Sequence, residues 1–230
     1  MNNNHDSMSD LNALLRDQLQ GLNRDFLKLL IFAHGKTPAE SRLPNLFVPA
    51  SVPKGLSELS PTALDGIAQC RYTLFSLAFH ATETWRCLAR TSRSSESIEQ
   101  RYGMTVDASC TAVRTANATF LAIALTFAWH LHHSDPRLAR VVLGLRDDTA
   151  LAFEAIPLWR LQQIAHERLD LLTARWPDNP GFWPDLLKFA GEGCAAQLES
   201  ARLVGAQLIA QELEPSSIQR LSPRARVRRR

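Results

Sequence analysis

With 230 residues, 45% of them hydrophobic and 21% charged, the chain can bury a sizeable core and is not disordered in bulk. The first six positions show no basic segment followed by an apolar one, and the four cysteines have no Cys-x-x-Cys spacing. We therefore expect no secretory signal, disulfide framework or zinc site, and a cytoplasmic protein. The net charge of the chain is +3. Residues 215–230 contain six arginines and no acid, so residues 1–214 have a formal charge of −3 (3 − 6).

The first predicted helix begins at Ser9-Asp10 and runs to about residue 33, where Gly35 and Pro38 end it. An apolar seam with steps of four and three follows one side of it: Leu15, Leu19, Leu22, Phe26 and Leu29. Packing within the chain's own domain is the simpler interpretation of this seam. Contact with a partner or with a second copy is the alternative.

A second helix is predicted from Ser60-Pro61, with a hydroxyl at the cap and proline in the first turn. We expect Leu64, Ile67, Arg71, Leu74 and Phe75 to lie on one side of this helix. Residues 90–100 are rich in serine and have no apolar face, so they are the best linker candidate, with a boundary near residue 97.

The second half opens with a hydrophobic helix over about 112–133, whose 14-residue apolar run at 118–131 is too short to span a bilayer. Further helices are predicted to start at Asp135-Pro136, to stop at Gly144, and to start again at Asp147-Asp148 and at Pro157. The last helix should run over about 184–213, with Gly191 and Gly193 as candidate break points. Its apolar seam includes Leu198 and Leu208. Because no alternating apolar run exceeds a few residues, the predicted class is all-α.

The two halves share a pattern at an offset of 97 positions, and 98 near its end. Its paired positions are Leu46 and Leu143, Val48 and Leu145, Leu56 and Phe153, Leu59 and Ile156, Leu64 and Leu161, Ile67 and Ile164, Ala68 and Ala165, Arg71 and Arg168, Leu74 and Leu171, Trp85 and Trp183, and Leu88 and Leu186. We interpret this run as two copies of one helical unit, over residues 1–97 and 98–214, followed by a basic disordered tail at 215–230.

The stretch from Leu143 to Ala165 resembles a known family. Its order is Leu143-Gly144-Leu145, an acidic pair, an apolar step and a Leu-x-x-Ile-Ala run, with Arg175-Trp176 following as an arginine beside an aromatic residue. This order is similar to that of the FlhD family of all-helical bacterial transcription co-regulators. The first copy departs from it, with Phe47 in place of Gly144 and prolines in place of the acidic turn.

The resemblance implies a transcriptional regulator subunit that acts with a zinc-containing FlhC-type partner at promoter DNA. Two fused units would stand in for a dimer and give pseudo-two-fold symmetry within one chain. In the family, DNA contacts follow the Arg-aromatic marker, but the only positive residue of that segment here is Lys188. The predicted phosphate contacts are therefore placed mainly in the tail: Arg224, Arg226, Arg228, Arg229 and Arg230, with Arg202 and Lys188 as weaker candidates.

The tail could also bind an acidic partner protein, or could be an inert solvated segment. The alternative function is a helical adaptor or chaperone-like scaffold that uses the seams at Leu15, Leu19, Leu22 and Phe26 and at Leu198 and Leu208, to bind a partner or to self-associate. His130, His132 and His133 are expected to lie at a solvated helix end rather than to bind metal. Cys194, near a helix start, lacks an identifiable base. We therefore expect no enzyme activity, no cofactor and no membrane insertion.

Overall fold

The computed structural model describes residues 3–35, 48–91 and 108–214, with side chains described from residue 13 in the first range and from residue 112 in the third. Its elements, in chain order, are α1 (Asn3–His34), α2 (Ser51–Glu58), α3 (Pro61–Ala68), β1 (Phe75–Ser76), α4 (Thr82–Thr91), α5 (Ala108–Ser134), α6 (Pro136–Leu143), α7 (Asp147–Glu154), α8 (Leu158–Glu167), the 3-10 helix η2 (Leu169–Leu171), β2 (Thr173–Ala174), α9 (Phe182–Gly191) and α10 (Ala195–Leu213). Because the strands have two residues each, the all-α prediction is confirmed.

Local capping explains where several helices begin and end. The Ser60 hydroxyl accepts a hydrogen bond from the Ala63 N–H at 3.2 Å, and Pro61 occupies the first turn of α3. The Asp135 carboxylate accepts from two backbone N–H groups at the start of α6, each at 3.0 Å. Gly144 ends α6 in the left-handed conformation, at φ 65°. These predicted boundaries are confirmed.

Other predicted boundaries are wrong in detail. Helix α1 begins at Asn3, before the proposed cap at Ser9-Asp10. The N-cap of α7 is Arg146, so the acidic pair Asp147-Asp148 lies in the first turn of the helix. Carboxylates at this end interact favourably with the helix dipole. The proposed last helix is two helices, α9 and α10, separated at Gly193, which has φ 68°. The predicted break in the last helix is therefore confirmed, and it lies at Gly193, the second of the two candidate glycines.

Helix α3 ends at Ala68, so Leu74 and Phe75 do not lie on it as predicted. The reason is the fully buried Asn23 on α1, whose side chain replaces the helical hydrogen bonds of the following segment. Its Nδ2 donates to the carbonyl oxygens of Ala68, Cys70 and Tyr72 at 3.2, 3.4 and 2.8 Å, and its Oδ1 accepts from the Leu74 N–H at 2.9 Å. One amide thus holds residues 68–74 in an irregular path toward β1.

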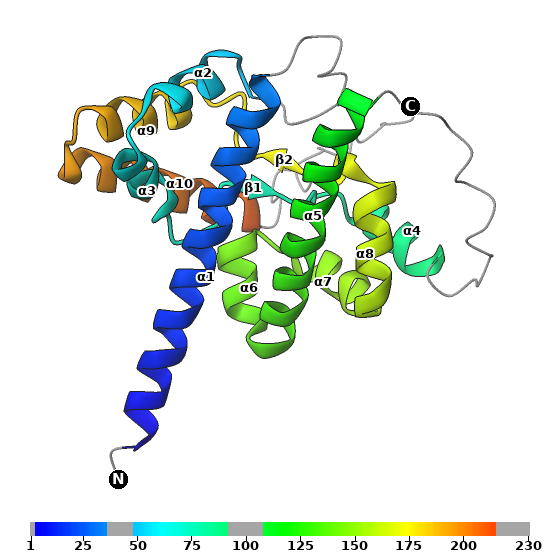
Figure 1. Ribbon diagram of the computed structural model, residues 1–230. Coiled ribbons are helices and arrows are strands. Elements are labelled where there is room, and N and C mark those ends of the chain that lie inside the picture. The colour runs from blue at the N-terminus through cyan, green and yellow to red at the C-terminus, as the bar shows by residue number, and fades with distance from the viewer. Residues whose placement is uncertain (1–2, 36–47, 92–107, 215–230) are drawn as a thin grey trace, which may run out of the picture.

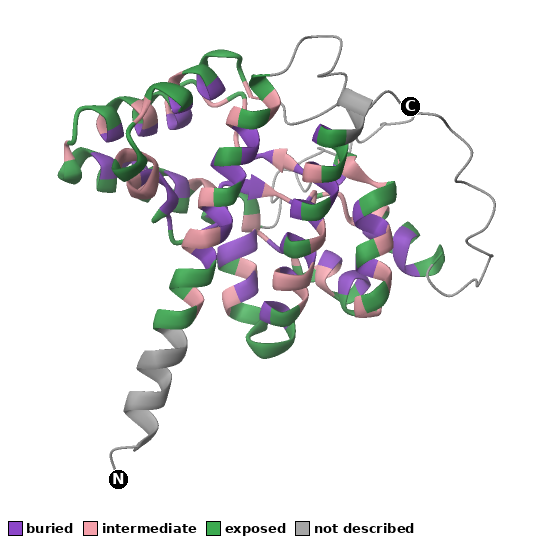
Figure 2. Ribbon diagram, in the orientation of Figure 1, coloured by how far each residue is buried: buried purple, intermediate pink, exposed green. Residues whose placement is uncertain are grey.

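Two long helices form the centre of the fold. Helices α1 and α5 pack against each other, and the small β1–β2 sheet appears between them in Figure 1. Helices α2 and α3 pack on α1, whereas α6, α7 and α8 pack on α5. Figure 2 shows the buried positions on the inward sides of these helices and exposed positions on their outer turns. One cluster of buried hydrophobic residues extends through both halves of the described chain.

Elements of the second half recur in the order of the first. The first residues of α7, α8, β2 and α9 follow those of α2, α3, β1 and α4 by 96, 97, 98 and 100 positions (147 − 51, 158 − 61, 173 − 75 and 182 − 82). The halves also exchange helices, because α4 packs on α7 whereas α9 packs on α2 and α3. The predicted boundary near residue 97 lies outside the described residues.

Helix α10 packs closely against Tyr72 at Gly205. A Cβ at Gly205 would overlap the Tyr72 hydroxyl, so only glycine lets the two elements approach this closely. The same hydroxyl donates to the Arg202 carbonyl oxygen at 2.9 Å. Near the far end of α10, Arg140 Nη2 donates to the Leu213 carbonyl oxygen at 3.4 Å. The helix is therefore held at its middle and at its C-terminal end.

Helix α5 is also long and apolar enough, over residues 112–134, to cross a membrane by length and composition. Core helices meet the same criterion. In this fold α5 packs against α1, α6, α7 and α8, and 44% of its apolar window is buried. These contacts place part of the apolar surface of α5 in the core of the fold.

Candidate functional site

A buried arginine lies where the two strands meet. Arg175 directly follows β2, and its side chain is 3% exposed. Its Nε donates to the Phe75 carbonyl oxygen of β1 at 3.1 Å, and its Nη1 lies 3.3 Å from Glu212 Oε2 of α10. The Glu212 carboxylate also accepts from Trp176 Nε1 at 2.6 Å. The arginine and its neighbour therefore bind one carboxylate together and attach α10 to the sheet.

The backbone at Gly144 makes room for this guanidinium. A Cβ at Gly144 would lie 2.9 Å from Arg175 Nη2 and 3.0 Å from Nη1. The same residue has φ 65°, a conformation that side chains rarely adopt. Gly144 and Arg175 are the two most distinctive residues of the family resemblance. The fold brings them into contact from positions 31 residues apart (175 − 144).

The charge and the N–H donors of the Arg175 guanidinium are only partly matched by acceptors among the described residues. Burial lowers the pKa of Arg175 to about 10, and the nearby Glu212 carboxylate acts in the opposite direction, so the group is still charged at neutral pH. A guanidinium has five N–H donors, and the described residues provide acceptors for two of them. The Glu212 side chain is 44% exposed, so part of its charge is screened by solvent. The guanidinium carbon also lies 5.5 Å from the centre of the Trp176 ring, and the N–H groups without an acceptor among the described residues can take a further one.

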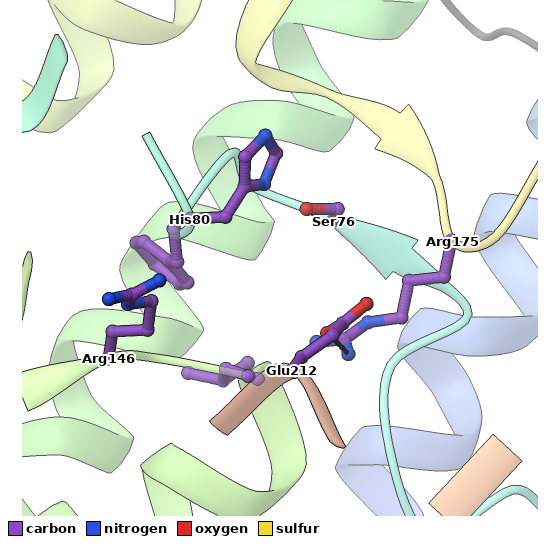
Figure 3. A pocket seen from close by; sticks show the side chains of 8 residues that line it. Ser76, His80, Arg146, Arg175 and Glu212 are labelled. Carbon is purple, nitrogen blue, oxygen red and sulfur yellow. Dashed lines mark hydrogen bonds and ion pairs between the residues drawn. The ribbon is translucent and has the colours of Figure 1, made fainter. Parts of the chain in front are cut away.

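A cavity of about 200 Å³ adjoins this guanidinium. Its lining residues are Ser76, Phe79, His80, Leu143, Gly144, Arg146, Arg175 and Glu212. Figure 3 shows Arg175 and Glu212 directed toward each other on one side of the cavity, with Arg146 and His80 on the opposite side. Arg146 is half-exposed, and its Nε is 3.4 Å from Asp148 Oδ1. Four side chains with hydrogen-bond donors thus surround a space that contains one carboxylate.

The predicted DNA-binding residues fall into two groups. The five tail arginines, Arg224, Arg226, Arg228, Arg229 and Arg230, lie outside the described residues. Lys188 is exposed on α9, with its Nζ 5.6 Å from the centre of the Phe189 ring. The Arg202 side chain is 15% exposed and bonded to Glu199 and to the Gly66 carbonyl oxygen at the end of α3. Arg202 is therefore occupied within the fold, whereas Lys188 faces solvent.

The apolar seams that were predicted for association pack largely against the core of the chain itself. Leu19, Leu22, Phe26 and Leu198 are buried, and Leu15 and Leu208 are half-buried against the same core. This geometry matches the simpler interpretation of the first seam. Other large hydrophobic side chains are exposed instead: Leu14, Phe32, Ile123, Val141, Leu151, Trp159, Leu203 and Val204.

The histidine cluster is only partly solvated. His132 is buried, and its Nδ1 has no hydrogen-bond partner among the described residues. The ring of His133 stacks on that of Trp129, with centroids 3.8 Å apart. The expectation of a solvated helix end is therefore wrong for His132, because the end of α5 packs near α7. In the described part of the chain, no three His, Cys, Asp or Glu residues are grouped to hold a metal.

Two of the described cysteines, Cys194 and Cys70, differ in their surroundings. Cys194 occupies the N-cap position of α10, where its Sγ lies 3.9 Å from the Glu192 carbonyl oxygen. Cys70 is buried, and burial raises the pKa of its thiol to about 11, although a hydrogen bond with Tyr72 acts in the opposite direction. The Cys70 thiol is therefore protonated at neutral pH.

Sequence reasoning identified three residues of the cavity, Leu143, Gly144 and Arg175, as part of the family pattern, and missed the others. Gly144 and Arg175 were noted as markers, whereas Ser76, His80, Arg146 and Glu212 were not connected with them. Glu212 is 37 residues from Arg175 (212 − 175), and Ser76 belongs to the other half of the chain. The one useful signal was the Leu-Gly step at Gly144, which predicted a turn but not the approach of a distant side chain.

Comparisons with family models, with curated proteins and with solved structures each find no match to this chain. A function for this chain therefore has to be inferred from its own residues and their geometry.

Proposed function

We propose that this chain is a transcriptional regulator subunit, a single-chain counterpart of a helical FlhD-like dimer that acts with an FlhC-type partner at promoter DNA. The proposal has three parts, which are a duplicated unit, a resemblance in sequence, and a separation of charge. Each part is supported by different residues.

The register of the two strands agrees with a duplicated unit. Phe75 pairs with Ala174 and Ser76 with Thr173. At an offset of 98, Ser76 corresponds to Ala174 (174 − 76) and Phe75 to Thr173 (173 − 75), so each residue pairs with the counterpart of its neighbour. A two-fold axis between identical antiparallel strands gives this register. Any two antiparallel strands of two residues pair in this way, so the register agrees with a duplicated unit, and the single observation that carries the proposal is the recurrence of backbone strain at the same offset.

Backbone strain recurs at the same offset. In the described chain the non-glycine residues with positive φ are Ala78, at 53°, and Trp176, at 47°. They lie 98 positions apart (176 − 78), each shortly after its strand. Since non-glycine residues seldom adopt this conformation, its occurrence at matched positions favours inheritance from one unit.

The buried tryptophans give a third correspondence. Trp85 Nε1 donates to the Ala78 carbonyl oxygen at 3.2 Å, and Trp183 Nε1 donates to the Arg175 carbonyl oxygen at 2.8 Å. The two acceptors lie seven and eight residues before their indoles (85 − 78 and 183 − 175). Each indole therefore closes the turn that follows its own strand. The exchange of α4 and α9 between the halves also fits a fused dimer.

The resemblance and the charge suggest the DNA role. The Leu-Gly step and the Arg-aromatic pair are both markers of the FlhD family, and here Gly144 and Arg175 are in contact. Residues 1–214 have a formal charge of −3, whereas residues 215–230 add +6 (3 − 6 = −3). Arginines attract phosphate regardless of base sequence, so in this proposal the tail supplies affinity and the partner supplies most of the sequence recognition.

The test is duplex binding by three forms of the full chain, with and without an FlhC-type partner. The forms are the native chain, a chain ending at residue 214, and a full-length chain with all six tail arginines changed to glutamine. Both altered chains should bind more weakly, and the slope of log affinity against log salt should flatten by roughly one unit for each phosphate that the tail no longer binds. A Lys54→Gln chain, which removes a positive charge from an exposed position on α2 outside the predicted DNA-binding residues, is the control and should change little. Unchanged affinity and slope in both altered chains would remove the tail from the mechanism.

A helical adaptor is the second candidate, and the exposed apolar pair Leu203 and Val204 on α10 favours it. Under that function the chain would bind a protein partner with equal affinity whether or not the tail is present. Retention of partner binding by a chain ending at residue 214, together with no DNA binding by the native complex, would select the adaptor.

A further inference from the structure

We propose that the cavity between Arg175 and Arg146 is a binding site for the phosphate or carboxylate group of a small metabolite, with the Glu212 carboxylate as its internal competitor. This inference does not depend on the proposed role in transcription. It is carried by the cavity, the donors that surround it and the replacement of those donors at the corresponding positions of the other half.

The side chains that line the cavity provide hydrogen-bond donors and positive charge suited to phosphate or carboxylate oxygens. Arg175 is buried, with N–H groups that lack an acceptor among the described residues, and Gly144 lets its Nη2 reach the cavity. Ser76 Oγ accepts from the Ala78 N–H at 3.2 Å, which leaves its hydroxyl hydrogen free to donate. Arg146 adds a second guanidinium from the start of α7. Paired guanidiniums and a hydroxyl bind phosphate and carboxylate oxygens well.

The size of the cavity limits the ligand. A space of about 200 Å³ is smaller than typical drug-sized pockets and holds a charged group with a short body. One carboxylate already lies there, since Glu212 accepts from both Arg175 and Trp176. This contact shows the kind of group that the site accommodates. A free anion would compete with Glu212 for the guanidinium.

The charged residues that line the cavity have no equivalents at the matching positions of the other half of the chain. The counterparts of Arg175, Ser76 and His80 at an offset of 98 are Leu77, Ala174 and Asp178, and the counterpart of Arg146 at 97 is Pro49. Two cations and a hydroxyl are thus replaced by groups that would not bind an anion. These charged and hydroxyl groups are therefore not shared by the two proposed units, which favours a separate role for them in this half.

The experiment measures binding of inorganic phosphate and of succinate to the full chain by calorimetry, and by thermal unfolding at matched ionic strength. The two probes distinguish a phosphate ligand from a carboxylate ligand. Arg146→Gln should weaken binding of the preferred anion about tenfold, since it removes one charged hydrogen bond. Arg146 is half-exposed, so this variant should fold normally. Arg137→Gln removes an equal charge from an exposed position outside the cavity and should leave binding unchanged.

Glu212→Gln provides an independent measurement. Removing the competing charge should strengthen anion binding several-fold, and the anion should stabilise this variant against heat more than it stabilises the native chain. Saturable binding that Arg146→Gln weakens and Arg137→Gln does not would support the site. No binding of either anion, equal weakening in both arginine variants, or weaker binding by Glu212→Gln would overturn it.

Discussion

The guanidinium of Arg175 lies against the backbone of Gly144, with Nη2 2.9 Å from the position that a Cβ would occupy. Gly144 also has φ 65°, so a side chain there would meet both backbone strain and the guanidinium. Gly193 has a similar φ of 68°, but no atom lies within 4 Å of its Cβ position. These two glycines therefore separate the effect of strain from that of contact.

Gly144→Ala should lower the free energy of unfolding by more than Gly193→Ala does. Left-handed strain alone accounts for about 1–2 kcal/mol at either position. Displacing the buried Arg175 from Glu212 and Phe75 should add at least about 1 kcal/mol at Gly144. Urea denaturation of the two variants measures the difference. Equal losses of stability would show that the guanidinium moves aside freely.

Asn23→Ala should be strongly destabilising, by about 2–4 kcal/mol, because it leaves buried backbone groups of residues 68–74 without partners. The Leu74 N–H and the Tyr72 carbonyl oxygen are bonded to this amide at 2.9 and 2.8 Å in the native chain. Asp25→Ala, at an exposed position two residues later on α1, is the control and should change stability by less than about 0.5 kcal/mol. Chemical denaturation of both variants measures the two effects. A small effect at Asn23 would mean that water readily replaces the amide.

Trp85→Phe and Trp183→Phe should destabilise the chain to a similar extent, at least about 2 kcal/mol each. Both remove a buried N–H donor from a turn carbonyl and leave a void. Thermal unfolding of each variant gives the comparison. Trp159→Phe, at a position 60% exposed, should be nearly neutral. Effects that differ by more than about 2 kcal/mol would argue against equivalent roles for the two indoles in the two halves.

His132 should make the protein less stable in mild acid. Burial lowers its pKa below the usual 6.5, although Glu154 acts to raise it. Below pH 6.5 the unfolded chain therefore binds a proton at this position that the folded chain does not. The contribution of His132 is fully present above that pH and is lost progressively as the pH falls toward the lowered folded-state value.

Measuring the free energy of unfolding between pH 7.5 and about 5 tests this direction. His132→Gln should flatten the pH dependence in that window, because it removes the group whose pKa is lowered by burial. A native chain whose stability rises as the pH falls from 7 to 6 would contradict the assigned direction.

Local chemistry in the sequence determined much of the secondary structure. Ser60-Pro61, Asp135-Pro136 and Gly144 set helix boundaries because their caps and backbone preferences act over only a few residues. The all-α class followed from the same kind of local pattern. The sequence also showed, through paired apolar positions such as Ile67 and Ile164, which side chains are buried in both halves.

The tertiary structure decided what those elements do together. Asn23 ended α3 early through hydrogen bonds to residues 45 to 51 positions away, and no local propensity encodes such contacts. Arg175 acquired its neighbours in the same way, from α10, from β1 and from the turn at Gly144. A buried charge is stabilised only by groups that folding brings to it, so its cavity could not be predicted from spacing along the chain.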